Sequence, residues 1–384
     1  MPPHSSYLRL DVRGGLNNQR ECIVNGIVAA HELGLHLVLP SAHPVGQGNE
    51  KYDPHDAKFE GIYADRTKWP DLRFGSLFDI DAARGLLHRA GIRASTTAPP
   101  RLPVVTLPAV EEEFPDCMGL RKVGGTCIAQ PSGARLFRAL LGKWDGRIRA
   151  SAAGPTIFDA RKSLCWNAYA SRNVANCSAE FPVACPAAFA AVSAWNGVIS
   201  DAQRAILTHV RAAAVAAGGG RGTPRAARLQ GLPDDGPLWA AVHVRIFGCS
   251  SNVNRRGANE TAAAAALSQF EWITGGLRKL AEERSLRPKV LYLVSSLPKA
   301  TVAAALPAQY TLISKDDVAG LAGLNKRLPF EVCAAIDYGI AVAAPVYAGM
   351  RLSSFDVFAS AERRAAGRQN ATVMRPGGKM CGGT

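Results

Sequence analysis

The stretch Gly14-Gly15-Leu16-Asn17-Asn18-Gln19-Arg20 decides how the first part of this chain folds. It joins a short apolar strand predicted over 7–12 to an amphipathic helix predicted over about 19–33. Glycines and amide side chains at a helix start expose backbone N–H groups, and the helix dipole there favours an anion. The stretch therefore predicts a turn that holds the diphosphate of a nucleotide-linked donor, although an ordinary strand-to-helix loop has a similar composition.

This turn is not the dinucleotide-binding fingerprint. That fingerprint needs three glycines, as G-x-G-x-x-G, and an acidic residue about 20 positions later that holds a ribose hydroxyl. The third glycine is missing here, and the second predicted strand, 35–39, continues into Pro40-Ser41-Ala42 without a carboxylate. The sequence therefore argues against an NAD-dependent enzyme.

Size and charge narrow the class of protein further. A chain of 384 residues with 47% hydrophobic content buries a large core and is long enough for two domains. A net charge of +14 attracts anionic ligands such as nucleotide diphosphates. The basic residues are scattered rather than clustered among aromatics, so we expect no nucleic-acid partner. The sequence contains no run of about 18 apolar residues, so no transmembrane segment is predicted.

The nine cysteines form no C-x-x-C pair, which argues against a zinc ribbon or thioredoxin chemistry. Two imidazoles in the His31–His36 region are five residues apart, which is the wrong spacing for a zincin helix, so no metal site is predicted.

Glycosylation sequons begin at Asn176, Asn259 and Asn370. Five cysteines crowd the middle third, which is typical of disulfides in an oxidising compartment: Cys117, Cys127, Cys165, Cys177 and Cys185. These features favour the secretory pathway, in the Golgi or endoplasmic reticulum lumen. The N-terminus shows no signal peptide, which leaves a cytoplasmic location open.

The chain divides at a glycine- and proline-rich segment, 218–237, predicted as a linker or a long loop. Residues 1–217 form the predicted N-terminal domain, with an irregular cysteine-containing insertion at about 110–200. Residues 238–384 form the predicted C-terminal domain, with strands at 239–245, 290–294 and 310–313 and helices at 262–283, 299–305, 331–342 and 355–366. Such alternation predicts parallel sheets covered on both faces. The fold class expected is α/β, with two facing Rossmann-like domains and a cleft between them.

A second motif, His243-Val244-Arg245, ends the first strand of the C-terminal domain. His243 and Arg245 are two residues apart and share a facing, at the strand end where doubly wound sheets bind ligands. A guanidinium there binds a diphosphate and neutralises charge on a leaving group, whereas a structural reading pairs the arginine with a carboxylate.

A third motif, Ser353-Ser354-Phe355, follows a turn and starts a helix. Its hydroxyls and free N–H groups suit a phosphate, and Phe355 suits packing on a base or ribose; the alternative is an N-cap serine and a core phenylalanine. Asp337 lies in an otherwise apolar helix, so it needs either a structural partner or a function.

The order and spacing of these motifs resemble the O-fucosyltransferase family. Residues 14–20 with Ile23-Val24-Asn25 resemble the opening of the plant O-fucosyltransferase-like glycosyltransferases, and 74–81 and His243-Val244-Arg245 resemble later motifs of that family. Ser353-Ser354-Phe355, followed by Glu362-Arg363, is similar to the protein O-fucosyltransferases. The region 110–200 carries little of this resemblance.

The resemblance implies a GT-B fold and metal-independent, inverting transfer of fucose from GDP-fucose, as donor substrate, to a hydroxyl of a glycoprotein or glycan; no cofactor is expected. It places Gly15, Leu16, Asn17 and Asn18 on the sugar-phosphate side. His243, Val244 and Arg245 would line the diphosphate, and Asp337, Ser353, Ser354 and Phe355 the guanosine end. Arg245 and Asn18 are the residues expected to serve catalysis, Arg245 by stabilising the departing GDP.

The chain also departs from the family pattern. Phe247 stands where the plant motif has a glutamate, and no carboxylate in the first loop is an evident general base, because Glu21 falls inside the predicted helix. Two alternatives therefore stand beside fucosyl transfer. One is a rhamnosyltransferase-like relative that uses UDP-rhamnose, and the other is a non-catalytic protein that binds a nucleotide sugar or glycan.

Overall fold

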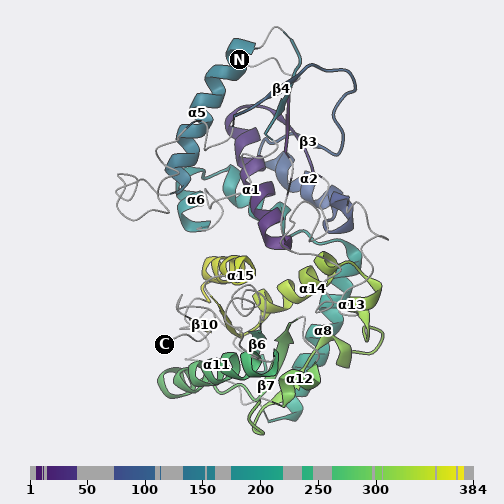
Figure 1. Cartoon of the computed structure of the whole chain (residues 1–384), viewed down its shortest axis with the longest axis vertical. Helices are drawn as coiled ribbons and strands as arrows, with labels where there is room; N and C mark the ends of the chain where they lie inside the picture. Colours follow the sequence, from purple (N-terminus) through teal and green to yellow (C-terminus); the bar gives the residue numbers. More distant parts are fainter. Residues whose placement is uncertain are drawn as a thin grey trace, which may run out of the picture. The chain divides into compact units, whose positions relative to one another are not determined.

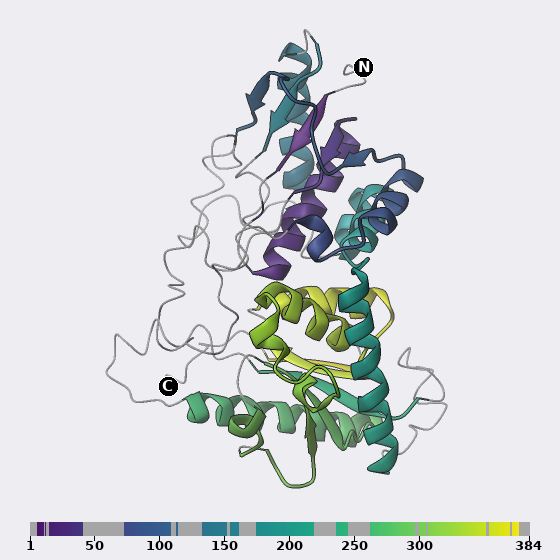
Figure 2. The same cartoon turned by 90° about the vertical axis from the view of Figure 1, so that its right-hand side faces the viewer.

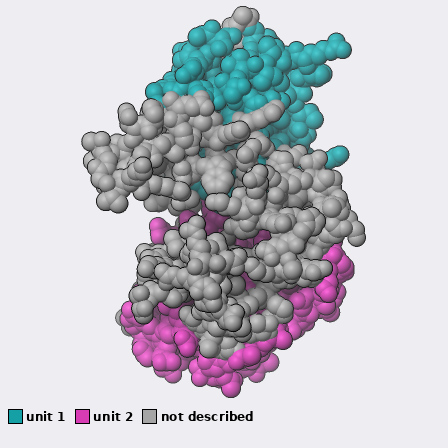
Figure 3. Space-filling view, in the orientation of Figure 1, with its two compact units in different colours: residues 1–56, 65–197 teal, residues 57–64, 198–384 magenta. Residues whose placement is uncertain are grey.

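The computed structural model describes residues 6–10, 12, 15–40, 73–108, 113, 133–151, 154–160, 174–218, 236–244, 262–295, 299–304, 306–350, 353–368 and 371–375. The chain forms two compact units, which Figure 3 colours separately. The first comprises Met1–Asp56 and Asp65–Gly197, and the second comprises Ala57–Ala64 and Val198–Thr384.

The first unit contains a five-stranded parallel sheet in the order β3-β2-β1-β5-β4. Its strands are β1 (Tyr7–Arg9), β2 (His36–Val38), β3 (Ala94–Ser95), β4 (Val104–Thr106) and β5 (Ile157–Asp159). Its helices are α1 (Leu16–Glu32), α2 (Ile80–Arg89), α5 (Gly133–Ser151), α6 (Val174–Glu180) and α7 (Ala184–Ala191), with a 3-10 turn, η3 (Phe74–Ser76). Strand β5, which pairs with both β1 and β4, was not predicted, because a strand of three residues shortly after Pro155 gives no periodic signal.

Helix α1, labelled in Figure 1, follows β1 in the chain, and its residues are buried along almost its whole length. The helix contacts both β2 and α7, so it is buried on more than one side. Its own apolar residues are therefore spread around the helix and do not form a single stripe. Gly26 lies where a Cβ atom would stand 2.6 Å from the Leu10 side chain, so a glycine is needed for this close packing. The helix begins at Leu16, three residues before the predicted start, with Gly15 at the N-cap.

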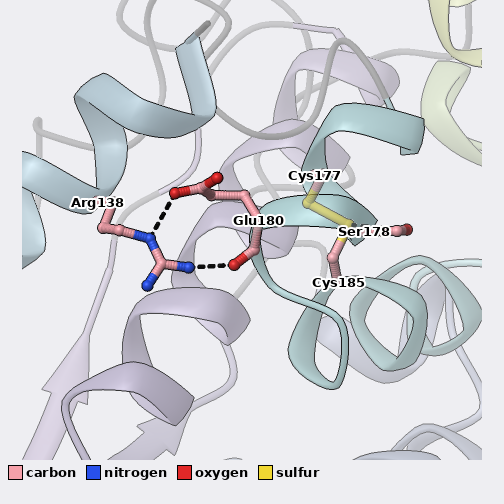
Figure 4. The surroundings of a disulfide bond; sticks show 5 residues. All are labelled: Arg138, Cys177, Ser178, Glu180 and Cys185. Atoms are coloured by element: carbon pink, nitrogen blue, oxygen red, sulfur yellow. Dashed lines mark hydrogen bonds and ion pairs between the residues drawn. A yellow bond between two sulfur atoms is a disulfide. The ribbon is translucent and has the colours of Figure 1, made fainter. Parts of the chain in front are cut away.

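A disulfide joins Cys177 of α6 to Cys185 of α7 (Figure 4). Beside it, the Arg138 guanidinium of α5 forms an ion pair of 2.6 Å with Glu180. These bonds connect α5, α6 and α7 in the region that the sequence left irregular. The expectation of disulfides among the middle cysteines is confirmed for this pair.

The second unit contains another five-stranded parallel sheet, in the order β10-β9-β6-β7-β8. Its strands are β6 (Trp239–His243), β7 (Val290–Val294), β8 (Thr311–Ile313), β9 (Val346–Met350) and β10 (Thr372–Arg375). The helices are α8 (Gly197–Ala216), α11 (Ala262–Arg284), α12 (Lys299–Ala303), α13 (Leu324–Arg327), α14 (Phe330–Ala343) and α15 (Ser354–Ala365), with a 3-10 turn, η6 (Lys315–Asp317).

The two faces of this sheet are covered by different helices. In Figures 1 and 2 the sheet lies between α11 on one side and α14 with α15 on the other. Alternate residues such as Val242 and Val244 join Phe270 and Leu277 of α11 in one apolar cluster. Because side chains alternate along a strand, His243 belongs to the opposite face. That face carries the polar residues described below.

Helix α8 packs against α14 within the second unit. The Gln203 amide donates a 2.9 Å hydrogen bond to the Ala335 carbonyl, and a Cβ at Gly339 would stand 2.1 Å from the Gln203 amide nitrogen. The structure thus groups this helix with the second unit, whereas the sequence prediction kept residues up to 217 in the first. The predicted linker, 218–237, lies almost entirely outside the described residues.

The predicted α/β class, with two Rossmann-like units that each contain a helix-flanked parallel sheet, is confirmed. The cleft between the units stays a prediction. Among the described helices, none is long and apolar enough to cross a lipid bilayer.

Candidate nucleotide site at the carboxyl ends of the strands

Each sheet has a point where its strand order reverses. In the first sheet the chain proceeds from β1 through β2 to β3 on one side, and β5 then pairs with the other side of β1. In the second sheet, β6, β7 and β8 run one way and β9 pairs with the other side of β6. Open α/β sheets bind ligands just beyond the carboxyl ends of the strands at such points. Of the residues predicted for the site, 15–18 follow β1, 243–245 begin at the last residue of β6, and 353–355 follow β9.

In the first unit, the first turn of α1 follows β1. Gly15 is the N-cap and its side-chain-free backbone leaves the first N–H groups of the helix uncovered by a cap side chain. Leu16 and Asn17 are buried, and Asn18 is half-buried. Asn18 is therefore the amide of this turn that remains accessible to a ligand.

Arg20, one turn later, is fully buried and fixes this turn in place. Its guanidinium donates to the Asn17 side-chain oxygen at 2.9 Å, to the Val192 carbonyl at 3.0 Å and to the Ser193 hydroxyl at 3.0 Å. It also lies 5.0 Å from the centre of the Trp195 ring. Arg20 thus ties the predicted phosphate turn to the segment after α7, a role that the sequence did not indicate.

In the second unit, His243 ends β6 on the face covered by α14 and α15. Its Nδ1 atom lies 2.8 Å from the Asp356 carboxylate of α15, and its ring packs against Phe355 with centroids 4.6 Å apart. Phe355 also meets the edge of Tyr338, at 5.4 Å. The structure therefore brings together His243 and Phe355, which the sequence had placed in one site from separate motifs.

Asp356 is fully buried and is the centre of this arrangement. Tyr347 of β9 donates its hydroxyl to the carboxylate oxygen that His243 does not use. Burial, with Asp356 beside it, raises the pKa of Tyr347 well above its ordinary value, so the phenol stays protonated and can donate. Gly349 leaves the room that this carboxylate occupies, because a Cβ there would stand 2.0 Å from it.

Helix α15 begins directly at this network. Ser353 is its N-cap and is buried, whereas Ser354 and Phe355 in the first turn are half-buried. The first N–H groups of a helix have no partner within the helix, and its dipole favours an anion there. The start of α15 therefore presents N–H donors at the same strand-order reversal as His243.

Asp337 of α14 has two internal partners. Tyr292 of β7 donates to one carboxylate oxygen at 2.7 Å and Lys315 donates to the other at 2.5 Å. Burial lowers the pKa of Lys315, but the nearby Asp337 carboxylate outweighs it, and the net pKa is raised above the ordinary value. Asp337 is thus held by two internal donors and is almost fully buried, so these contacts give it a structural role.

Neither thiol chemistry nor metal binding is indicated by the described residues. Cys333 is buried, and burial raises the pKa of its thiol to about 12, so it is protonated at neutral pH and is a poor nucleophile. Within the described residues, no cluster of three or more histidine, cysteine or acidic side chains could hold a metal ion.

Two predicted site residues, Val244 and Arg245, contribute no described side chain to the site. Val244 is buried in the apolar cluster under α11, so only its backbone lies at the strand end. Arg245, the residue predicted to stabilise the departing group, lies outside the described residues, as does Phe247. Its role stays a prediction.

Comparison with known proteins gives structural similarity alone. No protein-family model matches the sequence, and no curated protein matches it. The chain is similar to POFUT1 in complex with GDP-fucose, at 12% identity and a TM-score of 0.49 over 97% of this chain and 98% of that one. It is also similar to POFUT1 in complex with GDP (13% identity, TM-score 0.46, 97% and 99% covered) and to the fucosyltransferase NodZ from Bradyrhizobium (14%, 0.45, 92% of each).

Proposed function

We propose that this chain is a fucosyltransferase-like inverting glycosyltransferase that transfers fucose from GDP-fucose to an acceptor hydroxyl. One observation supports it above the others. His243 and the start of α15, which come from two separate motifs of the O-fucosyltransferase resemblance, meet at the strand-order reversal of the second sheet. This is the place where a doubly wound unit holds a nucleotide diphosphate.

The chemistry needs positive charge and N–H donors at the diphosphate. As the bond to the sugar breaks, negative charge develops on the β-phosphate, and donors fixed in advance stabilise it without reorganising. In the proposal, His243, Arg245 and the first turn of α15 supply these donors, and Phe355 packs against the ribose or base. The turn at Gly15–Asn18 supplies donors on the sugar-phosphate side.

The identities of the acceptor and of the donor sugar are also proposals. We place the acceptor among glycoproteins or glycans and the protein in the lumen of the secretory pathway. The Cys177–Cys185 disulfide supports this location, because disulfides persist in oxidising compartments. Phe247, in the position of the family glutamate, is the observation that favours a non-catalytic binding protein instead.

A donor scan tests the proposed activity. The protein is incubated with GDP-fucose, UDP-rhamnose, GDP-mannose and UDP-glucose, and released nucleotide is measured with and without glycan acceptors. We expect turnover of GDP-fucose above that of the other donors. Preferential turnover of UDP-rhamnose identifies the rhamnosyl variant. Nucleotide-sugar binding without any turnover contradicts the catalytic assignment and supports a binding protein.

A further inference from the structure

The pair formed by His243 and Asp356 fixes which ring nitrogen faces a ligand. Nδ1 of His243 lies 2.8 Å from the Asp356 carboxylate, and an ionised carboxylate only accepts hydrogen bonds. Nδ1 therefore carries a hydrogen, and Nε2 is the nitrogen left for a ligand. No hydrogen bond to Nε2 from another described residue is present.

Among the described basic side chains, His243 is the one that contacts the Asp356 carboxylate. The second carboxylate oxygen accepts from the neutral Tyr347 hydroxyl. Arg363, whose guanidinium carbon lies 5.7 Å from the Tyr347 ring centre, donates to backbone carbonyls at the end of α14, including those of Ala341 and Val342. Asp356 is fully buried, and its contact with His243 is an ion pair only when the histidine is protonated. The carboxylate can therefore stabilise the positive charge that a hydrogen on Nε2 would give to His243.

Among the described residues, the ring that packs on His243 is that of Phe355 in α15, which also meets Tyr338 of α14. Within the described part of the chain, Asp356 is thus the charged group that contacts His243, and Nε2 is the ring nitrogen left for a ligand. A diphosphate offers only acceptor oxygens, so it favours a hydrogen on Nε2 as well.

We propose that Asp356 is a positioning residue that makes His243 a cation when the diphosphate binds, so that donor binding is coupled to the uptake of a proton. This inference rests on the proposed function, because the diphosphate is its ligand. It assigns Asp356, which the sequence motifs did not single out, to the donor site. The coupling predicts that donor affinity falls as pH rises through neutrality, because the concentration of free protons available for the uptake falls.

Calorimetry of GDP-fucose binding tests the coupling. Titrations at several pH values up to about pH 8 are run in two buffers of different ionisation enthalpy, so that the protons taken up on binding are counted. GDP-fucose is preferred to GDP, because it has no terminal phosphate that titrates near pH ~6. We expect the wild type to take up close to one proton for each GDP-fucose bound.

Two variants separate the charge of Asp356 from its shape. Asp356→Asn keeps the size of the side chain but removes its charge; we expect the proton uptake to disappear and the affinity at about pH 8 to fall by about tenfold. Tyr347→Phe is the matched control, because it removes the other hydrogen bond to the same carboxylate and leaves the charge. We expect that variant to retain the uptake.

The outcomes are distinguishable. Binding of GDP-fucose by the wild type without proton uptake overturns the coupling and leaves the proposed function standing. Equal uptake in Asp356→Asn overturns the role of Asp356. Absence of any GDP-fucose binding contradicts the proposed function itself. Should Asp356→Asn fail to fold, ¹⁵N shifts of the His243 ring in the saturated wild type decide, because an unprotonated Nε2 there overturns the proposal.

Discussion

Replacing Lys315 by methionine should destabilise the protein by about 3–5 kcal/mol, which is the usual cost of breaking a buried ion pair from one side. Lys315 and Asp337 are each only 5% exposed, and the lysine ammonium donates to the aspartate carboxylate. The substitution leaves Asp337 with the Tyr292 hydroxyl as its hydrogen-bond donor and with no cation beside it. Urea unfolding followed by circular dichroism measures the change in the free energy of unfolding.

A surface pair in the same region provides the control. Lys299 donates to Asp317 at 2.7 Å, but the two side chains are 35% and 30% exposed. Lys299→Met should therefore cost no more than about 1 kcal/mol. The double variant Lys315→Met/Asp337→Leu should recover most of the loss, because no buried charge then remains unpaired. Equal effects of Lys315→Met and Lys299→Met would show that the buried pair does not support the fold.

Gly349→Ala should be similarly damaging, by about 3 kcal/mol or more, because it combines overpacking with the loss of a buried charge network. The added Cβ would stand 2.0 Å from the Asp356 carboxylate oxygen and 2.8 Å from the Tyr347 hydroxyl. The carboxylate cannot move away without weakening its bonds to Tyr347 and His243. Thermal melts and urea unfolding measure the loss of stability.

A double-mutant cycle isolates the cause of this effect. An Asp356→Ala background removes the closest clash and frees the Tyr347 hydroxyl to move, so the further change Gly349→Ala should cost less than about 1 kcal/mol. Gly275→Ala is the matched glycine control, because a Cβ at that position in α11 meets nothing within 4 Å. It should stabilise the helix by about 0.5–1 kcal/mol. An undiminished cost of Gly349→Ala in the Asp356→Ala background would contradict the proposed clash.

The alternation of apolar strands and amphipathic helices was sufficient to predict most of the second unit. The strand predicted over 290–294 coincides with β7, and the helix predicted over 331–342 lies within α14. Strands β5 and β10 were not predicted from the sequence, because short segments without a clear hydrophobic period depend on their neighbours in the sheet for their conformation. β9 was not predicted because it is apolar like the helix before it and is separated from that helix by Ala344-Pro345 alone.

The site was predictable where a motif sits directly at the end of a strand. His243 and Phe355 are neighbours as expected, because strand order brings β6 beside β9. The partners that hold them were not predictable, because they depend on long-range contacts. Asn17 is held by Arg20, which in turn is fixed by Val192, 172 residues later in the chain. Asp356 looked like an ordinary residue of a helix start, and only the fold shows that it pairs with His243.

The central claim is that a guanosine diphosphate binds where β6 ends, with a guanidinium immediately after that strand. Thermal unfolding with GDP, UDP and NAD, in the wild type, in Arg245→Ala and in the exposed-helix control Arg278→Ala, tests it most directly. The account predicts that GDP at a hundredfold excess over its dissociation constant stabilises the wild type and Arg278→Ala by about 2.7 kcal/mol. UDP and NAD should give much less, and Arg245→Ala should lose the effect of GDP. Stabilisation by NAD instead, or by GDP equally in Arg245→Ala, would contradict the account.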